Sequence, residues 1–176
     1  MAILKREGYT GLTTARVADL AGQNKALISY HFGGKQGLVA EVARGVAELI
    51  TSRTRESIAG AHDGSELAAA LVDAVFGIIE EDDGIQRVYF DLISHSVVDE
   101  RVGEIMADMK SRFRAVLGER LREIAPGQSA ADGEAASVFL IAGVEGLALE
   151  RLERGETPAL RRARKLWVRS AAGLLS

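Results

Sequence analysis

The sequence has no cysteine and only two prolines among its 176 residues, and aromatic side chains make up just 5 % of it. Without cysteine the chain can form neither disulfides nor thiolate metal sites, which agrees with a reducing compartment. We find no run of alternating β-branched residues bounded by turn residues, so strands are not expected. No segment approaches a membrane span, and the N-terminus lacks the pattern of a signal peptide. We therefore expect a cytoplasmic protein that does not engage a membrane.

Abundant Ala, Leu, Glu and Arg instead favour helices, and a hydrophobic content of 47 % is enough for a core. The net charge of −3 is unevenly distributed. Residues 1–55 carry eight basic and four acidic side chains, whereas the remainder carries 14 basic and 21 acidic ones. A basic N-terminal part on an acidic body suggests that only the first part contacts a polyanion.

Capping and helix-breaking residues divide the chain into about nine helices. Gly8 ends the first, Thr13 or Thr14 caps the second and Asn24 caps the third, which Gly33-Gly34 breaks. Further on, Ser65 and Asp99 act as caps, and residues 80–84 form an acidic break. Ser129-Ala-Ala-Asp132 resembles a capping box, and Thr157-Pro158 is a strong helix start. The expected helices cover residues 1–7, 14–21, 24–32, 35–58, 65–79, 85–98, 99–124, 129–154 and 157–175.

Residues 13–38 read as a helix-turn-helix followed by the start of another helix. Two short helices at a steep angle need a small residue where they cross, which is Ala18, and a glycine for a turn with positive φ, which is Gly22. Val17, Leu20, Ala21 and Ile28 have the spacing to attach both helices to the rest of the domain. The polar residues 23–25 then lie at the N-terminal end of the second helix, the end that enters a major groove.

The stretch of residues 8–38, which includes this helix-turn-helix, resembles the TetR-type bacterial transcriptional regulators. Its most specific part is Ile28-Ser-Tyr-His-Phe-Gly-Gly-Lys-Gln-Gly-Leu38, in which an aromatic-His-Phe is followed by Lys and then Leu. The resemblance covers about 30 residues, and the rest of the chain matches only in helix count and length. It departs from the family pattern at Gln23, where an apolar residue is preferred, and at Ser29, which replaces a frequent tyrosine.

The resemblance implies two kinds of DNA contact. Gln23, Asn24 and Lys25, with Ala26 beside them, would face base edges, where amides and ammonium groups discriminate donor and acceptor patterns. Phosphate contacts set register rather than sequence. Their expected residues are Thr14, Ser29, Tyr30, His31 and Lys35. Phe32 and Leu38 would belong to the core.

For the acidic body, the resemblance implies a small-molecule pocket. Met and Phe suit an adaptable apolar cavity, and His95 and Tyr89 could orient a ligand. A plain helix-bundle core is the alternative for each of these residues. The predicted pocket residues are Phe76, Tyr89, Phe90, Ile93, His95, Met106, Met109 and Phe113.

The last two predicted helices carry more apolar surface than one buried stripe requires. Small residues such as Gly143 and Gly146 allow close helix approach, so a four-helix bundle between two copies is expected, as the family also builds. Glu145 lies inside this apolar stretch and needs a partner or a wet cavity. The predicted interface residues are Phe139, Ala142, Glu145, Gly146, Leu149, Leu152, Leu166, Trp167, Ser170 and Leu174.

These patterns together predict an all-α protein with a three-helix DNA-binding head at residues 1–34, connected by the start of helix 35–58. Residues 59–176 would form a helical ligand-binding and dimerisation domain. The predicted function is a homodimeric repressor that a small-molecule effector releases from a palindromic operator on double-stranded DNA, without a cofactor. The alternative is a helical dimeric adaptor that has lost specific DNA binding. We do not expect an enzyme, because His31, His62 and His95 are scattered and no nucleophile elbow or phosphate loop occurs.

Overall fold

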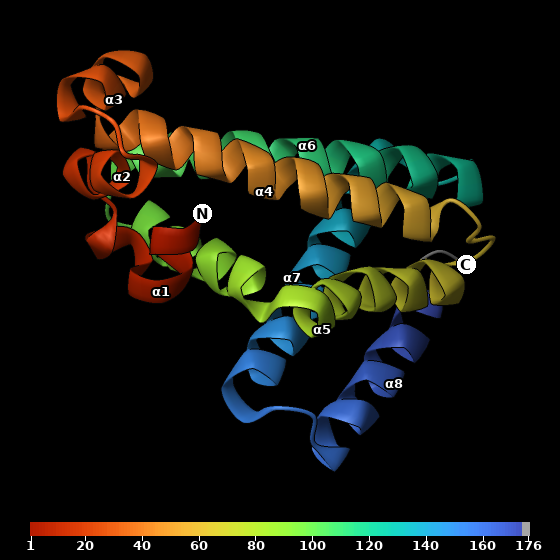
Figure 1. The fold of residues 1–176 in the computed structure, drawn as a ribbon. Helices are drawn as coiled ribbons and strands as arrows, with labels where there is room; N and C mark the ends of the chain where they lie inside the picture. Colours follow the sequence, from red (N-terminus) through yellow and green to blue (C-terminus); the bar gives the residue numbers. More distant parts are fainter. Residues whose placement is uncertain (174–176) are drawn as a thin grey trace. The chain divides into compact units, whose positions relative to one another are not determined.

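The computed structural model describes residues 1–173, and this part of the chain is all-helical. The prediction of an all-α fold is therefore confirmed. The described residues contain eight helices rather than nine, because the two predicted helices on either side of residues 80–84 are continuous (Figure 1). The helices are α1 (Ala2–Gly11), α2 (Thr14–Ala21), α3 (Lys25–Phe32), α4 (Lys35–Ile58), α5 (Gly64–Ser96), α6 (Glu100–Ile124), α7 (Ala130–Arg154) and α8 (Pro158–Ala172). The predicted end of the last helix at Leu175 lies outside the described residues.

Side-chain caps begin most of these helices where the sequence predicts them. Thr13 accepts a hydrogen bond from the backbone N–H of Arg16, and Thr157 accepts one from Leu160. At the start of α7, the Ser129 hydroxyl accepts from the N–H of Asp132. Each such bond satisfies a donor that the first helical turn leaves unpaired.

The predicted cap at Ser65 is wrong. The carboxylate of Asp63 accepts from the N–H of Glu66 at 2.8 Å, and the Glu66 carboxylate reaches back to the N–H of His62 at 2.7 Å. This reciprocal arrangement satisfies two free donors at once. It therefore moves the cap from Ser65 to Asp63, two residues earlier than expected, and α5 begins at Gly64.

Two helices contain a break in their dihedral angles. Gly8 in α1 has φ 66° and ψ −171°, so the predicted stop at Gly8 is a kink after which helical structure continues to Gly11. Asp82 in α5 has φ −160° and ψ 91°, which places a kink inside the predicted acidic break at residues 80–84.

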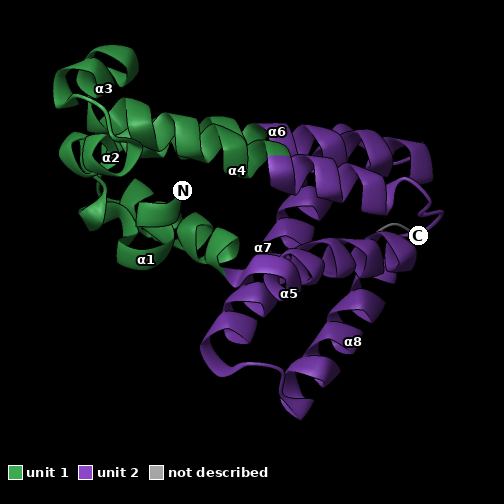
Figure 2. Ribbon diagram, in the orientation of Figure 1, with its two compact units in different colours: residues 1–48, 84–111 green, residues 49–83, 112–176 purple. Residues whose placement is uncertain are grey.

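The chain divides into two compact units, coloured separately in Figure 2. Residues 1–48 and 84–111 form unit 1, and residues 49–83 and 112 onward form unit 2. Unit 1 buries apolar side chains from α1, α4, α5 and α6, among them Leu4, Val39, Leu92 and Val102, together with Leu12 just after α1. The predicted division at residue 59 stays a prediction.

Unit 2 contains a contiguous apolar cluster. Leu67, Leu71 and Leu117 are completely buried in it, and Leu140 is 1 % exposed. Trp167 packs against the cluster from α8. Within residues 1–173, none of the helices combines the length and the apolar character that crossing a bilayer requires.

Candidate DNA-binding site

The helix-turn-helix is built by α2, a tight turn and α3. Ala18 of α2 is 2 % exposed and Ile28 of α3 is 8 % exposed, and the two helices pack against each other, so these are the buried side chains of the motif. Gly22 ends α2 with φ 62° and ψ 31°, and the N–H of Gln23 donates to the carbonyl of Ala18 at 2.9 Å. A glycine adopts this left-handed conformation without steric cost, which keeps the turn short.

Two of the predicted attachment residues point elsewhere. Leu20 is 68 % exposed and Ala21 is exposed. Leu20 follows Ala18 by two positions, which places it about 200° around the helix from the buried side. The apolar spacing in α2 therefore marks one buried position, Ala18, with Val17 half-buried beside it.

The N-terminal end of α3 is open to solvent. Gln23, Asn24, Lys25 and Ala26 are all exposed, and so is more than half of Leu27. The Asn24 side-chain oxygen accepts from the N–H of Ala26 at 2.8 Å and thereby caps α3. Its amide nitrogen is then the group with which Asn24 could donate to a base, while Lys25 extends an ammonium group one residue further on.

The predicted phosphate contacts differ in exposure. Tyr30 is 89 % exposed and His31 is exposed, with the His31 ring edge-on to Phe32 at 4.7 Å. Thr14, Ser29 and Lys35 are half-buried. Of the two predicted core residues, Leu38 is buried and Phe32 only half-buried. Exposed and half-buried polar groups of this kind are able to reach a DNA backbone.

Lys35 also belongs to a cluster around the buried side chain of Tyr9 in unit 1. The Lys35 ammonium lies 3.8 Å from the centroid of the Tyr9 ring, a cation–π contact. The His95 ring lies 4.2 Å from the same ring. The Tyr9 hydroxyl donates to Asp99 at 3.2 Å, and the Tyr9 backbone N–H donates to Asp91 at 2.5 Å. Tyr9 thus ties α1 to residues of α4 and α5 and to the start of α6.

Asp99 has two roles, one for each of its carboxylate oxygens. One carboxylate oxygen accepts from the N–H groups of Arg101 and Val102 and so caps α6, and the other accepts from Tyr9. The hydrogen bond from the Val102 N–H is the main cause that lowers the pKa of Asp99. Burial of the Tyr9 ring, followed by the bond to Asp99 and its charge, raises the pKa of Tyr9.

We expect Tyr9→Phe to flatten the alkaline loss of stability. A raised pKa means that the folded protein holds the phenolic proton more tightly than the unfolded chain does. The contribution of Tyr9 is therefore complete below its unfolded pKa of about 10 and is lost as the pH rises through the folded value. Urea unfolding at intervals from pH 7 to 11 measures this. Parallel pH profiles for the variant and the unaltered chain would contradict the expectation.

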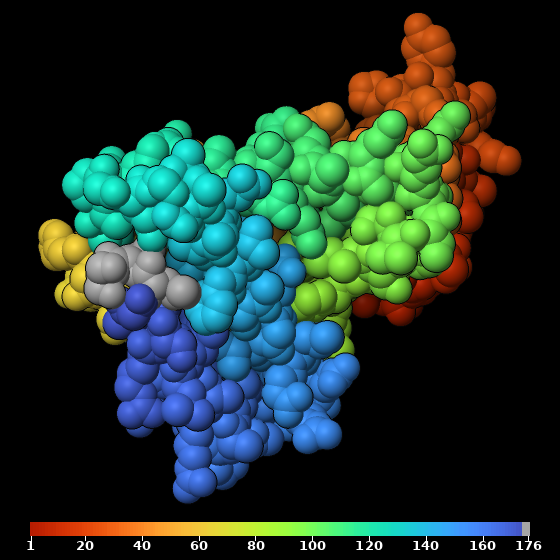
Figure 3. Space-filling model, turned by 180° about the vertical axis from the view of Figure 1, so that it is seen from behind, coloured from red at the N-terminus to blue at the C-terminus, as the bar shows by residue number. Residues whose placement is uncertain are grey.

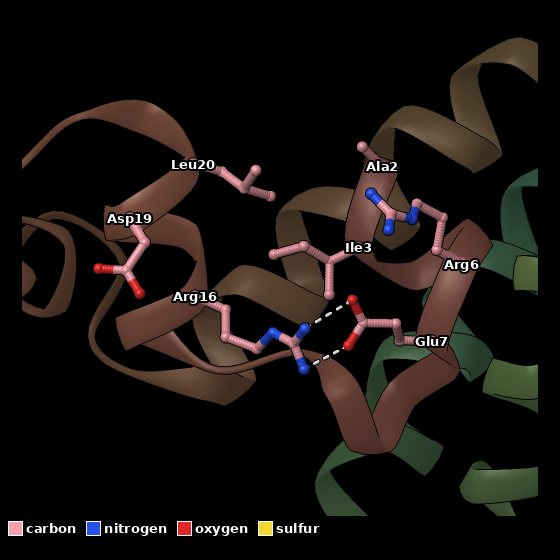
Figure 4. A pocket seen from close by; sticks show the side chains of 7 residues that line it. All are labelled: Ala2, Ile3, Arg6, Glu7, Arg16, Asp19 and Leu20. Atoms are coloured by element: carbon pink, nitrogen blue, oxygen red, sulfur yellow. Dashed lines mark hydrogen bonds and ion pairs between the residues drawn. The ribbon is translucent and has the colours of Figure 1, made fainter.

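A groove of about 290 Å³ lies between α1 and α2 (Figure 4). Figure 4 shows Arg16 directed at Glu7, and an Arg16 guanidinium nitrogen donates to the Glu7 carboxylate at 2.7 Å. The exposed side chain of Leu20 lines the same groove with Ile3 and Arg6. None of the predicted ligand-pocket residues lines it.

The predicted pocket residues fall into both units. Tyr89, Phe90, Ile93, His95, Met106 and Met109 belong to unit 1, and Phe76 and Phe113 to unit 2. Four of the eight are buried, namely Phe76, Tyr89, Met106 and Met109. The His95 ring contacts the Tyr9 ring, and its Nε2 lies 3.6 Å from the Asp91 carboxylate. Both neighbours are side chains of unit 1.

The predicted dimer residues lie on α7 and α8, which pack side by side in unit 2 (Figure 1). Phe139, Leu149 and Leu166 are 37 %, 41 % and 57 % exposed, and Ala142, Gly146 and Ser170 are also exposed. Glu145, Leu152 and Trp167 are half-buried. Leu174 lies outside the described residues. The two helices therefore present an apolar surface that this chain alone leaves uncovered.

Residues 64–176 match the family model of the C-terminal part of BetI-type transcriptional repressors, and residues 1–42 match the model of bacterial regulatory proteins of the tetR family. The chain therefore belongs to the TetR family of bacterial transcriptional regulators, as the Tyr30-His-Phe32 motif predicts.

A solved structure from Pseudomonas aeruginosa PAO1 is 27 % identical, with a TM-score of 0.79 over 98 % of this chain and 86 % of that one. A TetR transcription regulator from Haloarcula marismortui, 19 % identical, has the same fold (TM-score 0.76; 99 % and 93 % covered).

Among curated proteins, the HTH-type transcriptional repressor KstR2 of Rhodococcus jostii is 26 % identical over 112 residues, which is 64 % of this chain. The HTH-type transcriptional regulator BetI of Vibrio parahaemolyticus is 24 % identical over 134 residues, or 74 % of this chain. The alignments cover 54 % and 66 % of these two relatives.

Sequence reasoning missed Tyr9, Asp91 and the second role of Asp99. Tyr9 stands within the recognised motif, but its partners Asp91 and Asp99 follow it by 82 and 90 residues. No local pattern connects positions so far apart. The cap pattern at Asp99 was the one available signal, and it accounts for only one of the two carboxylate oxygens.

Proposed function

We propose that this chain is a homodimeric repressor that binds a palindromic operator through α3 and is released by a small-molecule effector. The observation that carries the DNA-binding part is the geometry around Gly22: buried Ala18 and Ile28 on either side of a left-handed turn, and an exposed N-terminal end of α3. Lys25 and Asn24 would read base edges there, and Tyr30, His31 and Lys35 would contact phosphates, with Thr14 and Ser29 as further polar groups beside them.

The homodimer is supported by the uncovered apolar surface of α7 and α8. Phe139, Leu149 and Leu166 expose large apolar groups to solvent, and contiguous exposed apolar patches mark interaction sites. A two-fold symmetric dimer would present two copies of α3 to successive major-groove faces, about 34–36 Å apart. A palindromic operator follows from that symmetry.

The effector is supported by a buried polar group in unit 1. Gln86 is 3 % exposed, and its side-chain oxygen has no hydrogen-bond partner within the described residues. An unsatisfied buried acceptor costs about 1–3 kcal/mol, so a bound hydroxyl or amide donor is favoured there. Buried Tyr89 and Met106 of the same unit belong to the predicted pocket. An effector would have to bind one conformation more tightly than the other, since equal affinity shifts nothing.

The DNA-binding role is tested by enrichment of randomised duplex DNA on the full chain, followed by anisotropy titrations at several salt concentrations. Lys25→Ala is expected to cost about 1–3 kcal/mol in specific binding and to relax one operator position. Lys35→Ala is expected to weaken binding to all sequences and to reduce the salt slope by about one.

Arg114→Ala is the matched control, because Arg114 is an exposed cation of α6 outside the proposed site. It should change neither the affinity nor the salt slope. Equal effects of Lys25→Ala and Lys35→Ala on specificity and salt slope would contradict the assignment of their roles. Failure to enrich any duplex would contradict DNA binding itself and favour the adaptor.

A further inference from the structure

Helix α8 has an unusual charge pattern. It carries five basic side chains and no acidic one in 15 residues. Like charges three or four positions apart destabilise a helix, so opposite charge from elsewhere stabilises a helix of this composition. One source is Glu156 in the preceding turn, which pairs with Arg164 at 2.8 Å and Arg161 at 3.5 Å. The same carboxylate also lies 3.5 Å from Arg151 of α7.

Glu156 therefore serves three arginines and leaves three basic residues of α8 to be accounted for. Arg162, Lys165 and Arg169 are exposed, and their spacing of three and four places them along one side of the helix. We name these three residues the basic stripe. It runs beside the exposed Leu166, so charge and apolar surface occur together on α8.

Helix α7 has the opposite pattern. It carries five acidic side chains against two basic ones. Its exposed apolar residues Phe139, Ala142 and Leu149 follow one face, and Glu153 ends that face one turn beyond Leu149. Glu134 and Glu150 lie on either side of it, by helical spacing. We name Glu134, Glu150 and Glu153 the acidic set.

Both helices reach the surface of unit 2, and there the residues of the acidic set and of the basic stripe are exposed, except for the half-buried Glu150. Figure 3 shows the side chains of α7 and α8 at the molecular surface, with α7 in lighter and α8 in darker blue. Within the chain, the two helices are held together at Gly143, whose backbone adjoins the indole of Trp167, and by stacking of Phe139 on Trp167 at 6.4 Å. The exposed side chains of this helix pair, which we call the exposed layer, are thus partly apolar, with acidic groups mainly on α7 and basic groups on α8.

A basic amphipathic helix is also typical of membrane surfaces and of nucleic-acid binding. The neighbouring acidic helix argues against both, because its carboxylates would meet the same anionic surface and be repelled by it. A second copy of this layer has no such conflict. In a two-fold symmetric dimer, α7 of each copy can face α8 of the other copy, so this contact occurs twice. The acidic helix of one copy then meets the basic helix of its partner at both places.

We propose that the acidic set on α7 of one copy pairs with the basic stripe on α8 of a second copy, and that this pairing selects the homodimer over other partners. The proposal rests on the homodimer proposed above. The exposed apolar residues supply the buried area, and the flanking charges determine which chain is accepted, as at the edges of coiled coils.

The test uses two charge-reversed full-length variants. One carries Arg162→Glu, Lys165→Glu and Arg169→Glu, and the other carries Glu134→Lys, Glu150→Lys and Glu153→Lys. Sedimentation equilibrium measures self-association of each, and a fluorescence pair on the two chains measures mixed dimers. Each variant alone is expected to dimerise at least about tenfold more weakly, since like charges then face each other. An equimolar mixture should restore association to within severalfold of the unaltered chain.

Glu119→Lys and Arg114→Glu, at exposed positions of α6, are the control reversals and should leave dimerisation unchanged. Circular dichroism checks that each variant is folded. Where a triple variant is not, Lys165→Glu and Glu153→Lys replace the two sets, with the same expected pattern. Salt should weaken the dimer of the unaltered chain, because exposed charge pairs are screened.

Reversed variants that dimerise as tightly as the unaltered chain would overturn the charge pairing while leaving the homodimer intact. A monomer of the unaltered chain at micromolar concentration would instead overturn the homodimer. Binding of the unaltered chain to vesicles of phosphatidylcholine and phosphatidylglycerol, abolished by the Arg162, Lys165 and Arg169 reversals, would overturn the proposal in favour of a membrane surface.

Discussion

Gly143→Ala is expected to lower the free energy of unfolding by about 1–3 kcal/mol, the range for overpacking a filled site. A Cβ atom at this position would lie 1.9 Å from the indole nitrogen of Trp167 and 2.5 Å from the adjoining ring carbon. Both distances are far inside van der Waals contact. The bulky, half-buried indole must therefore move, and with it the packing of α8 on α7.

Gly133→Ala is the matched control in the same helix. Nothing lies within 4 Å of a Cβ atom at that position. This substitution is expected to stabilise the protein by about 0.5–1 kcal/mol, because alanine loses less backbone entropy in a helix than glycine. Thermal and urea unfolding measure both variants. Equal stabilisation by the two alanines would contradict the close approach of Trp167 to Gly143.

Self-association of Gly143→Ala provides a second measurement on the same variant. If α8 moves on α7, the exposed layer that carries Phe139 and Leu166 changes its shape. We therefore expect weaker dimerisation of this variant than of Gly133→Ala at equal protein concentration. Sedimentation equilibrium at a temperature where both variants are folded separates this effect from loss of stability.

Tyr9→Ala is expected to cost about 3–5 kcal/mol of unfolding free energy, as for other buried aromatic residues replaced by alanine. It removes the ring that contacts His95 at 4.2 Å and Lys35 at 3.8 Å, and also the hydroxyl that donates to Asp99. The backbone bond to Asp91 survives, because it uses the main-chain N–H. The loss of unfolding free energy therefore measures the contribution of the Tyr9 side chain alone.

Two further variants help to interpret this loss of stability, one by keeping the Tyr9 ring and the other by removing an exposed tyrosine. Tyr9→Phe keeps the ring and loses only the hydroxyl, so it should cost about 0.5–1.5 kcal/mol. Tyr30→Ala removes a tyrosine that is 89 % exposed, and its effect on stability should stay within about 0.5 kcal/mol. Urea unfolding at pH 7 compares the three. A cost of Tyr9→Ala no larger than that of Tyr30→Ala would contradict the central place of Tyr9 in unit 1.

The helix-turn-helix was predictable because its signals are local. Thr13 and Asn24 cap the helix that follows each of them, and Gly22 and Gly33 end α2 and α3 in the left-handed conformation. Each of these features satisfies backbone groups within four residues along the chain. Where such reasoning failed, the competing signal was equally local, as with Asp63, two residues before the predicted cap at Ser65.

Burial was less predictable, because it depends on what packs against a helix. The apolar spacing of α2 includes Leu20, yet only Ala18 of this helix is buried, and Leu20 lines the groove beside α1. His95 stands in a stretch of apolar residues that suggests a ligand pocket. Its neighbours in the structure are Tyr9 of α1 and Asp91 of α5, and its place in a ligand pocket stays a prediction.

The sequence by itself determined the helices, the turn of the DNA-binding motif and the opposite charges of residues 130–154 and 158–172, since caps, glycines and composition act over short distances. Only the tertiary structure decided that Tyr9 joins Asp91 and Asp99, and that Gly143 accommodates Trp167. These contacts depend on how helices pack, which no local pattern encodes. Packing also leaves both apolar and charged side chains of α7 and α8 exposed.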